Sequence, residues 1–314
     1  MQKIGLVGAG LIGRAWAISF ARGGCAVSMY DPVDGAAAAS RALIPAMLAD
    51  LAAADLLDGQ TEAQVMQRIA VAASLEDALD GADHVQENAP ERLEVKRPLW
   101  QQLDALAAPE TVLASSTSAI LPSAFSEGLS GGARCVVAHP INPPYLVPAV
   151  EVVPAPWTAQ ETVARTAALM RAIGQVPIVM KKELAGFIMN RMQGALLQEA
   201  FRLVDDGYAS AEDVDVGIRD GLGLRWAFMG PFETIDLNAP GGVTDYVERY
   251  QDIYVRLWPS QQRRPDWGPA LAERIAAERS ASLPRDRIAA RTRWRDRELM
   301  ALVAHKRRRS ANDA

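Results

Sequence analysis

The sequence predicts an α/β protein, with a Rossmann-like doubly wound sheet domain followed by an all-α C-terminal domain. Three observations predict it: short apolar runs alternate with helical patterns in the first half, a glycine-rich turn follows the first run, and strand signals stop after Glu183. A chain of 314 residues is long enough for two domains, each with its own core. We place the sheet domain at residues 1–183 and the helical domain at residues 184–314.

The predicted sheet begins with a βαβ unit. Residues 3–7 form an apolar run, a helical pattern spans residues 14–22, and residues 25–30 form a second run. The same alternation continues through residues 82–86, 93–106, 111–115 and 134–139. Strands that alternate with helices favour a parallel sheet, because each helix returns the chain to the same edge.

The predicted helical domain begins with an amphipathic segment. Six apolar side chains share one face of it: Phe187, Ile188, Met192, Leu196, Ala200 and Val204. Ser210 and Asp213 then resemble a capping box, which marks the start of another helix. Residues 285–309 are rich in Lys and Arg and predict a helix with a solvated basic face; binding of an anion or a nucleic acid is the alternative.

Composition narrows the classes of function. A hydrophobic fraction of 49% and a formal net charge of -5 indicate an ordinary globular protein and argue against a dedicated nucleic-acid binder. Cys25 and Cys135 lie in apolar runs and are predicted to be buried free thiols, which indicates a reducing compartment. No signal peptide is recognised and no segment approaches the ~18 apolar residues of a membrane span, so we expect a cytoplasmic protein.

The glycine-rich turn predicts a dinucleotide site. Gly8, Gly10 and Gly13 spell G-x-G-x-x-G directly after the first strand. The first glycine allows the tight turn, the second lets the backbone approach a pyrophosphate, and the third permits close packing of the helix. The helix that follows presents its N-terminal amides to a phosphate, so we expect Leu11 and Ile12 to lie against the cofactor as well.

An acidic residue ends the second strand. Asp31 stands about 20 residues after the turn, where a carboxylate can accept hydrogen bonds from a ribose diol. The same carboxylate repels a 2′-phosphate, and no arginine stands nearby. The sequence therefore predicts NAD rather than NADP.

A histidine and a glutamate predict a proton acceptor beside that site. His139 ends the apolar strand at residues 134–139, and Glu151 lies within a second apolar run at residues 149–153. If the two runs lie side by side, Glu151 can accept a hydrogen bond from one ring nitrogen while the other faces a substrate. Taken singly, a structural histidine and a solvated glutamate are the alternatives.

Several motifs occur in the order typical of one enzyme family. They are Ser115-Ser116-Thr117-Ser118, His139-Pro140-x-Asn142-Pro143, Glu151 and Gly186-Phe187-Ile188-x-Asn190-Arg191. With them the chain resembles the 3-hydroxyacyl-CoA dehydrogenase family. It is most similar to the lambda-crystallin and L-gulonate 3-dehydrogenase branch, through Asn142-Pro143-Pro144-Tyr145, the segment 221–231 and Ala289-Ala290-Arg291-x-x-Trp294-Arg295-Asp296.

The resemblance implies roles for individual residues. His139 takes the proton of the substrate hydroxyl, Glu151 orients His139, and Ser118 and Asn190 hydrogen-bond the reacting oxygen or the nicotinamide. Three further residues are expected to contact the cofactor: Glu91, Lys96 and Ser116. A surface pair is the alternative for Glu91 and Lys96, a helix-capping serine for Ser118 and an ordinary polar helix position for Asn190. The resemblance also implies a homodimer through the helical domain, and no metal site is predicted.

Two departures bear on the substrate. Ser116 stands where the acyl-CoA enzymes commonly have asparagine, and Arg225-Trp226 replace smaller or uncharged residues. Because arginine binds a carboxylate through two hydrogen bonds, we predict that Arg225 holds the carboxylate of a small 3-hydroxy acid. A structural salt bridge is the alternative for Arg225. For the whole chain the alternatives are a 3-hydroxyacyl-CoA dehydrogenase and a noncatalytic, crystallin-like NAD(H)-binding protein.

Overall fold

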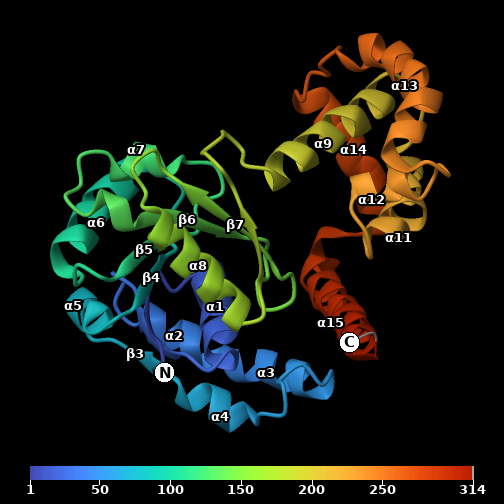
Figure 1. Cartoon of the computed structure of the whole chain (residues 1–314). Coiled ribbons are helices and arrows are strands. Elements are labelled where there is room, and N and C mark those ends of the chain that lie inside the picture. Colours follow the sequence, from blue (N-terminus) through green and yellow to red (C-terminus); the bar gives the residue numbers. More distant parts are fainter. Residues whose placement is uncertain (313–314) are drawn as a thin grey trace. The chain divides into compact units, whose positions relative to one another are not determined.

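A computed structural model describes residues 1–312 (Figure 1). Their contacts form two compact units. Unit 1 comprises Met1–Asn190 and the described residues from Arg293 onward, and unit 2 comprises Arg191–Thr292. This division differs from the predicted boundary at residue 183 by a few residues, and it assigns most of the last helix to unit 1.

Unit 1 contains one eight-stranded sheet in the order β3-β2-β1-β4-β5-β6-β7-β8. The strands are β1 (Lys3–Val7), β2 (Ala26–Tyr30), β3 (Ile69–Val71), β4 (His84–Glu87), β5 (Val112–Ser115), β6 (Cys135–Pro140), β7 (Ala149–Pro154) and β8 (Val176–Val179). Neighbouring strands are parallel except for the antiparallel pair β6–β7. The predicted Rossmann-like sheet is confirmed.

Helices cover both faces of the sheet. They are α1 (Leu11–Arg22), α2 (Ala36–Ala42), α3 (Ile44–Ala53), α4 (Glu62–Gln67), α5 (Leu75–Leu79), α6 (Leu93–Leu106), α7 (Pro122–Ser126) and α8 (Gln160–Ala172). Strand side chains alternate between two buried clusters: Val136 and Ala138 belong to one, Cys135 and Val137 to the other. Cys25 and Cys135 are both buried and free, as predicted.

The last helix, α15 (Ile288–Asn312), packs on unit 1 along most of its length. Met300 and Ala304 are 4% and 8% exposed and join the core cluster that contains α1 and α3. Arg307 also pairs with Asp58 at 2.7 Å. The predicted helical domain ran to residue 314; the burial of these apolar side chains explains why α15 is instead grouped with the sheet.

One segment has the length and composition of a membrane span, although none was predicted from the sequence. It is Ala36–Ala53, with a mean hydropathy of 1.3. Here it spans two helices, α2 and α3, and Ile44, Leu48 and Leu51 are completely buried in the core of unit 1. A single such segment is weak evidence for a membrane span, and packing against the sheet accounts for its apolar residues.

Unit 2 is helical, as predicted for this part of the chain. Its elements are most of α9 (Met189–Asp205), α10 (Ala211–Val216), the π-helix Gly217–Leu222, α11 (Gly223–Trp226), α12 (Pro231–Asp236), α13 (Gly242–Gln261), α14 (Pro269–Ser282), the 3-10 helix Arg285–Arg287 and the first residues of α15. The predicted capping box at Ser210 and Asp213 is present at the start of α10. The predicted start of α9 is wrong: Phe187 and Ile188 precede the helix, because Gly186 and Phe187 adopt left-handed backbone at φ 77° and 49°.

Candidate active site

The turn between β1 and α1 needs glycine for two different reasons. Gly8 has a φ of +92°, and a Cβ there would lie 2.8 Å from the carbonyl oxygen of Asn88. A Cβ on Gly13 would lie 1.9 Å from the carbonyl oxygen of Gly8. At Gly10, by contrast, no atom lies within 4 Å of such a Cβ. The open space at Gly10, in front of the amides of α1, fits a pyrophosphate that approaches the backbone.

Asp31 is tied to this turn. It follows β2, and its Oδ2 accepts a hydrogen bond from the Ala9 amide at 2.8 Å, while Oδ1 accepts one from Val33 at 3.0 Å. The carboxylate is therefore held beside the glycine turn, where the ribose of a dinucleotide lies in this fold. At the start of α1, Leu11 is 56% exposed although it is apolar, and Ile12 is half-buried. These residues fit a bound NAD.

The predicted pair of His139 and Glu151 is present. The two residues are direct neighbours across the antiparallel strands β6 and β7, and His139 Nδ1 lies 2.7 Å from Glu151 Oε2. His139 is 5% exposed and Glu151 is completely buried. Because an ionised carboxylate can only accept hydrogen bonds, Nδ1 carries the proton of this contact and Nε2 faces away from Glu151.

The start of α9 holds the other oxygen of Glu151. Oε1 accepts hydrogen bonds from the amides of Ile188 at 2.6 Å and Met189 at 2.8 Å. Burial by itself raises the pKa of Glu151, but the hydrogen bonds from His139, Met189 and Ile188 outweigh it and lower the pKa below its ordinary value. Glu151 is therefore ionised at neutral pH.

Phe187 was not predicted to take part in the site. Its ring is completely buried, and its centroid lies 5.5 Å from that of the His139 imidazole. A left-handed φ is rare for a residue of this size, and such backbone is found most often at functional sites. The only sequence signal was its place in the motif around Gly186, since the hydrophobic pattern suggested a helix.

The side chain of Asn190 contacts the backbone of Ser118. Asn190, the second residue of α9, donates from Nδ2 to the carbonyl oxygen of Ser118 at 2.7 Å. Because Met189 contacts Glu151, the first turn of α9 joins Ser118 to the pair of His139 and Glu151. The structure therefore brings together all four residues that were predicted to be catalytic.

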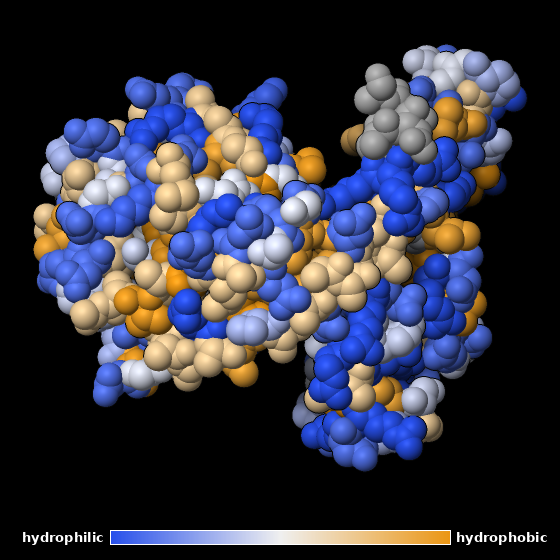
Figure 2. Space-filling view, turned by 90° about the horizontal axis from the view of Figure 1, so that it is seen from below, coloured by the Kyte–Doolittle hydropathy of each residue, from blue (hydrophilic) through white to orange (hydrophobic). Residues whose placement is uncertain are grey.

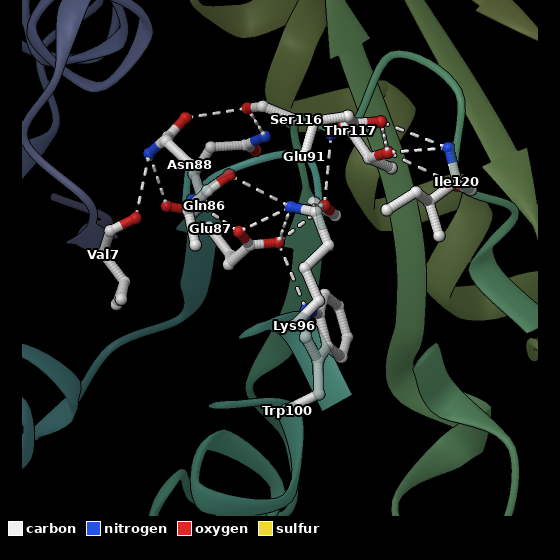
Figure 3. Close-up of polar contacts among 12 residues, drawn as sticks. Val7, Gln86, Glu87, Asn88, Glu91, Lys96, Trp100, Ser116, Thr117 and Ile120 are labelled. Carbon is white, nitrogen blue, oxygen red and sulfur yellow. Dashed lines mark hydrogen bonds and ion pairs between the residues drawn. The ribbon is translucent and has the colours of Figure 1, made fainter. Parts of the chain in front are cut away.

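Glu91 organises the loop that carries Ser118. Its Oε1 accepts hydrogen bonds from the amides of Ser118 at 3.1 Å, Ala119 at 2.9 Å and Ile120 at 3.2 Å, and from the Thr117 hydroxyl. Figure 3 shows Glu91 beside Thr117 and Ile120. Burial opposes ionisation, but these hydrogen bonds and the charge of Lys96 lower the pKa of Glu91. The carboxylate is thus the anion around which the loop folds.

Two predicted cofactor residues are bonded within the protein. The Ser116 hydroxyl accepts hydrogen bonds from Trp16 at 3.0 Å and Gln86 at 2.7 Å and donates one to Asn88 at 2.8 Å. Lys96 is 1% exposed and paired with Glu87, a residue that sequence reasoning missed. Because Lys96 is buried, it forms no surface pair with Glu91, which was the alternative. Its ammonium is bonded to Glu87 and not open to a cofactor, which was the prediction.

Arg225 lies in α11 of unit 2 and is exposed. Within the described part of the chain, no ion pair is found for its guanidinium, whereas nearby Arg219 pairs with Glu212 and Asp220. Among the described residues, Arg225 therefore has no acidic partner with which to form the alternative, a structural salt bridge.

Comparisons with known proteins identify the family of the chain. The profile of the NAD-binding domain of 3-hydroxyacyl-CoA dehydrogenase matches residues 3–184, and that of its C-terminal domain matches residues 186–273. Lambda-crystallin of Oryctolagus cuniculus is 41% identical over 305 residues, which cover 96% of this chain and 95% of that protein. L-carnitine dehydrogenase of Pseudomonas aeruginosa is 36% identical over 304 residues, covering 96% and 93%.

Two solved structures have a similar overall fold. An NAD+-dependent dismutase, 5-formyl-3-hydroxy-2-methylpyridine 4-carboxylic acid 5-dehydrogenase, superposes with a TM-score of 0.82 at 29% identity, covering 96% of this chain and 97% of that one. The 3-hydroxybutyryl-CoA dehydrogenase of Escherichia coli has a TM-score of 0.66 at 30% identity, covering 83% and 53%.

Proposed function

The chain belongs to the 3-hydroxyacyl-CoA dehydrogenase family, and from this we propose that it oxidises the 3-hydroxyl of a small 3-hydroxy acid, in the manner of an L-gulonate 3-dehydrogenase. Its cofactor is NAD. The observation that carries the proposal is the buried pair of His139 and Glu151, linked through the start of α9 to Ser118. A noncatalytic, crystallin-like role would not require this pair.

The proposed reaction has two parts, the transfer of a hydride to the cofactor and the transfer of a proton to the protein. A bound NAD would supply the acceptor for the hydride that leaves C3 of the substrate. His139 Nε2 takes the proton of the 3-hydroxyl, and the C3–O single bond becomes the carbonyl double bond of a ketone. Glu151 fixes the ring through Nδ1 and stabilises the imidazolium that forms, because its carboxylate stays ionised. We assign the hydrogen bonds to the reacting oxygen to Ser118 and Asn190, which the motifs of the family suggest and which contact each other at 2.7 Å.

The proposed substrate is a free acid because a carboxylate can pair with the positive charge of Arg225. L-carnitine, named for one relative, and the pyridine carboxylic acid named for another both carry a free carboxylate. Arg225 is an exposed guanidinium with no acidic partner among the residues that the structure describes, as a carboxylate-binding residue requires. A 3-hydroxyacyl-CoA is the second candidate, which the family profile and the E. coli structure favour.

A substrate panel tests this proposal. L-gulonate, L-carnitine, 3-hydroxybutyrate and 3-hydroxybutyryl-CoA are each assayed with NAD by NADH absorbance, and a free acid is expected to give the highest kcat/KM. For that acid, Arg225→Met is expected to raise KM by about 10-fold or more, because a hydrogen bond to a charged group is worth about 1.5–3 kcal/mol.

Arg219→Met is the matched control, since Arg219 is also an exposed arginine of unit 2 but is paired with Asp220 at 2.9 Å. It is expected to leave KM unchanged. A preference for the CoA thioester would overturn the proposed substrate, and an unchanged KM in Arg225→Met would overturn the role of Arg225.

We also propose that two copies of the chain associate through unit 2. Among the described residues of this unit, the buried apolar side chains are Val204, Ala211, Ala239 and Leu271. Large apolar side chains are instead exposed along α13: Val247, Ile253, Val255, Leu257 and Trp258, by 44–55%. Figure 2 shows hydrophobic residues, in orange, among hydrophilic ones, in blue, on one face of the molecule. So much exposed apolar surface favours an interface with a second copy.

Sedimentation equilibrium checks the dimer. The wild-type protein is expected to have twice the monomer mass, and Ile253→Asp is expected to raise the dimer dissociation constant by at least about 10-fold, because a buried charge at an interface has no partner. Leu106→Asp, at an exposed apolar residue of α6 in unit 1, is the control. A monomeric wild-type protein would contradict the proposal.

A further inference from the structure

We propose that a buried polar network of Glu87, Lys96 and Ser115 positions Ser118 for the reaction, so that Glu87 and Ser115 are positioning residues. Glu87 ends β4 and Ser115 ends β5, and Lys96 reaches both from the first turn of α6. Figure 3 shows the ammonium of Lys96 against the carboxylate of Glu87. The effect on turnover rests on the proposed function. The effect on the geometry of the loop does not.

Glu87 is the centre of this network. It is completely buried at the end of β4, and both of its oxygens are used. Oε1 accepts hydrogen bonds from the Ala89 amide at 2.5 Å and Lys96 at 2.8 Å. Oε2 accepts from Lys96 at 3.0 Å, Trp100 at 3.2 Å and Ser115 at 2.6 Å. Its position is therefore determined by donors from β5, α6 and the chain following β4.

Lys96 is enclosed by the same groups. Its ammonium contacts both oxygens of Glu87, the Ala89 carbonyl at 3.3 Å and the Ser115 hydroxyl at 3.5 Å. An ammonium has three donors, and these contacts occupy them. A buried ion pair is a poor source of stability, because desolvation offsets the attraction, and apolar side chains would hold the sheet as well. What the pair provides is a defined geometry.

A chain of hydrogen bonds carries this geometry to Ser118. The Ser115 hydroxyl donates to Glu87 and accepts from the Thr117 amide at 3.1 Å. The Thr117 hydroxyl in turn donates to Glu91 and accepts from the Ile120 amide at 3.0 Å. Glu91 then binds the amides of the Ser118 loop, and the Ser118 carbonyl accepts from Asn190. Ser115 is the single side chain that joins the buried ion pair to Thr117 in this route.

Ser115→Ala tests the proposal, since it removes the link and keeps the pair of Glu87 and Lys96. Thr111→Val is the matched control: Thr111 is a buried residue directly before β5, and its hydroxyl donates to the Ala82 carbonyl at 2.7 Å, at the opposite end of the strand. Both variants lose one buried hydroxyl, and both are expected to lower Tm by about 2–8 °C.

Only Ser115→Ala is expected to affect the site. Its kcat should fall about 10- to 100-fold, because a displacement of about 1 Å in a reacting group can cost 10²-fold, while the Kd of NADH stays at the wild-type value. Hydrogen exchange at the amides of Ser118, Ala119 and Ile120 should become at least about 10-fold faster than in Thr111→Val. That measurement needs no substrate.

The measurements distinguish a failure of the proposed function from a failure of the positioning role. A wild-type protein that turns over none of the acids tested contradicts the proposed function, whereas the exchange rates still test the network. Unchanged exchange at these three amides in Ser115→Ala overturns the positioning role. So does a wild-type kcat, or a loss of NADH affinity as large as the loss of kcat, which would show that the network serves the cofactor instead.

Discussion

His139→Asn is expected to lower kcat by about 10²- to 10⁴-fold and to bind NADH as tightly as the wild-type protein. Asparagine is close to the imidazole in size and its amide can still donate to Glu151, but it offers no basic nitrogen in the place of Nε2. The turn at Gly8, Gly10 and Gly13 is untouched, so the cofactor site remains. NADH fluorescence titration and steady-state kinetics measure the two quantities separately.

Glu151→Gln extends this test to pH. Because the pKa of Glu151 in the folded protein lies below its ordinary value of 4.5, the ionised side chain stabilises the fold above that value, and this contribution is lost as pH falls through the folded pKa. In Glu151→Gln, the free energy of unfolding should therefore decrease less on acidification than it does in the wild-type protein. The kcat of this variant should also fall less than that of His139→Asn. If His139→Asn keeps wild-type turnover, His139 is not the proton acceptor.

Gly13→Ala is expected to destabilise unit 1 and to abolish measurable NADH binding. The added Cβ would lie 1.9 Å from the Gly8 carbonyl oxygen, and that atom is backbone, so the turn between β1 and α1 must shift. Forcing an extra carbon into a packed position typically costs about 1–3 kcal/mol, and more where backbone must move. Thermal unfolding without cofactor measures the first effect, and NADH titration measures the second.

Gly10→Ala separates packing from binding. A Cβ on Gly10 meets no atom within 4 Å, so Tm should stay within about 2 °C of the wild-type value. The same Cβ would occupy the space through which a pyrophosphate approaches the backbone, so the Kd of NADH should rise by at least about 10-fold. A stable Gly13→Ala, or a Gly10→Ala with wild-type affinity, would contradict this account of the turn.

The elements with a strong local pattern were predicted well. β1 spans residues 3–7 and α6 spans residues 93–106, as their apolar spacing indicated. β3 was missed because three positions cannot establish a period of two. β8 was missed although it is as long as β4 and β5: it contains Pro177, which argues against a strand in sequence and is tolerated here at the edge of the sheet. β6 and β7 were expected side by side, but their antiparallel register, which places His139 opposite Glu151, comes from the pairing of whole strands.

The sequence by itself indicated the family and the cofactor, and it singled out His139 and Glu151 as a candidate pair. The glycine turn, Asp31 and the motifs around His139 and Asn190 are local patterns whose residue types are required by local geometry or by the chemistry. Only the tertiary structure decided that Lys96 lies buried against Glu87, that Phe187 packs on His139, and that α15 joins the sheet unit. The physical reason is that the type of a residue does not reveal whether its side chain faces solvent or a neighbouring element. Burial depends on segments that are distant in sequence and that only folding brings together.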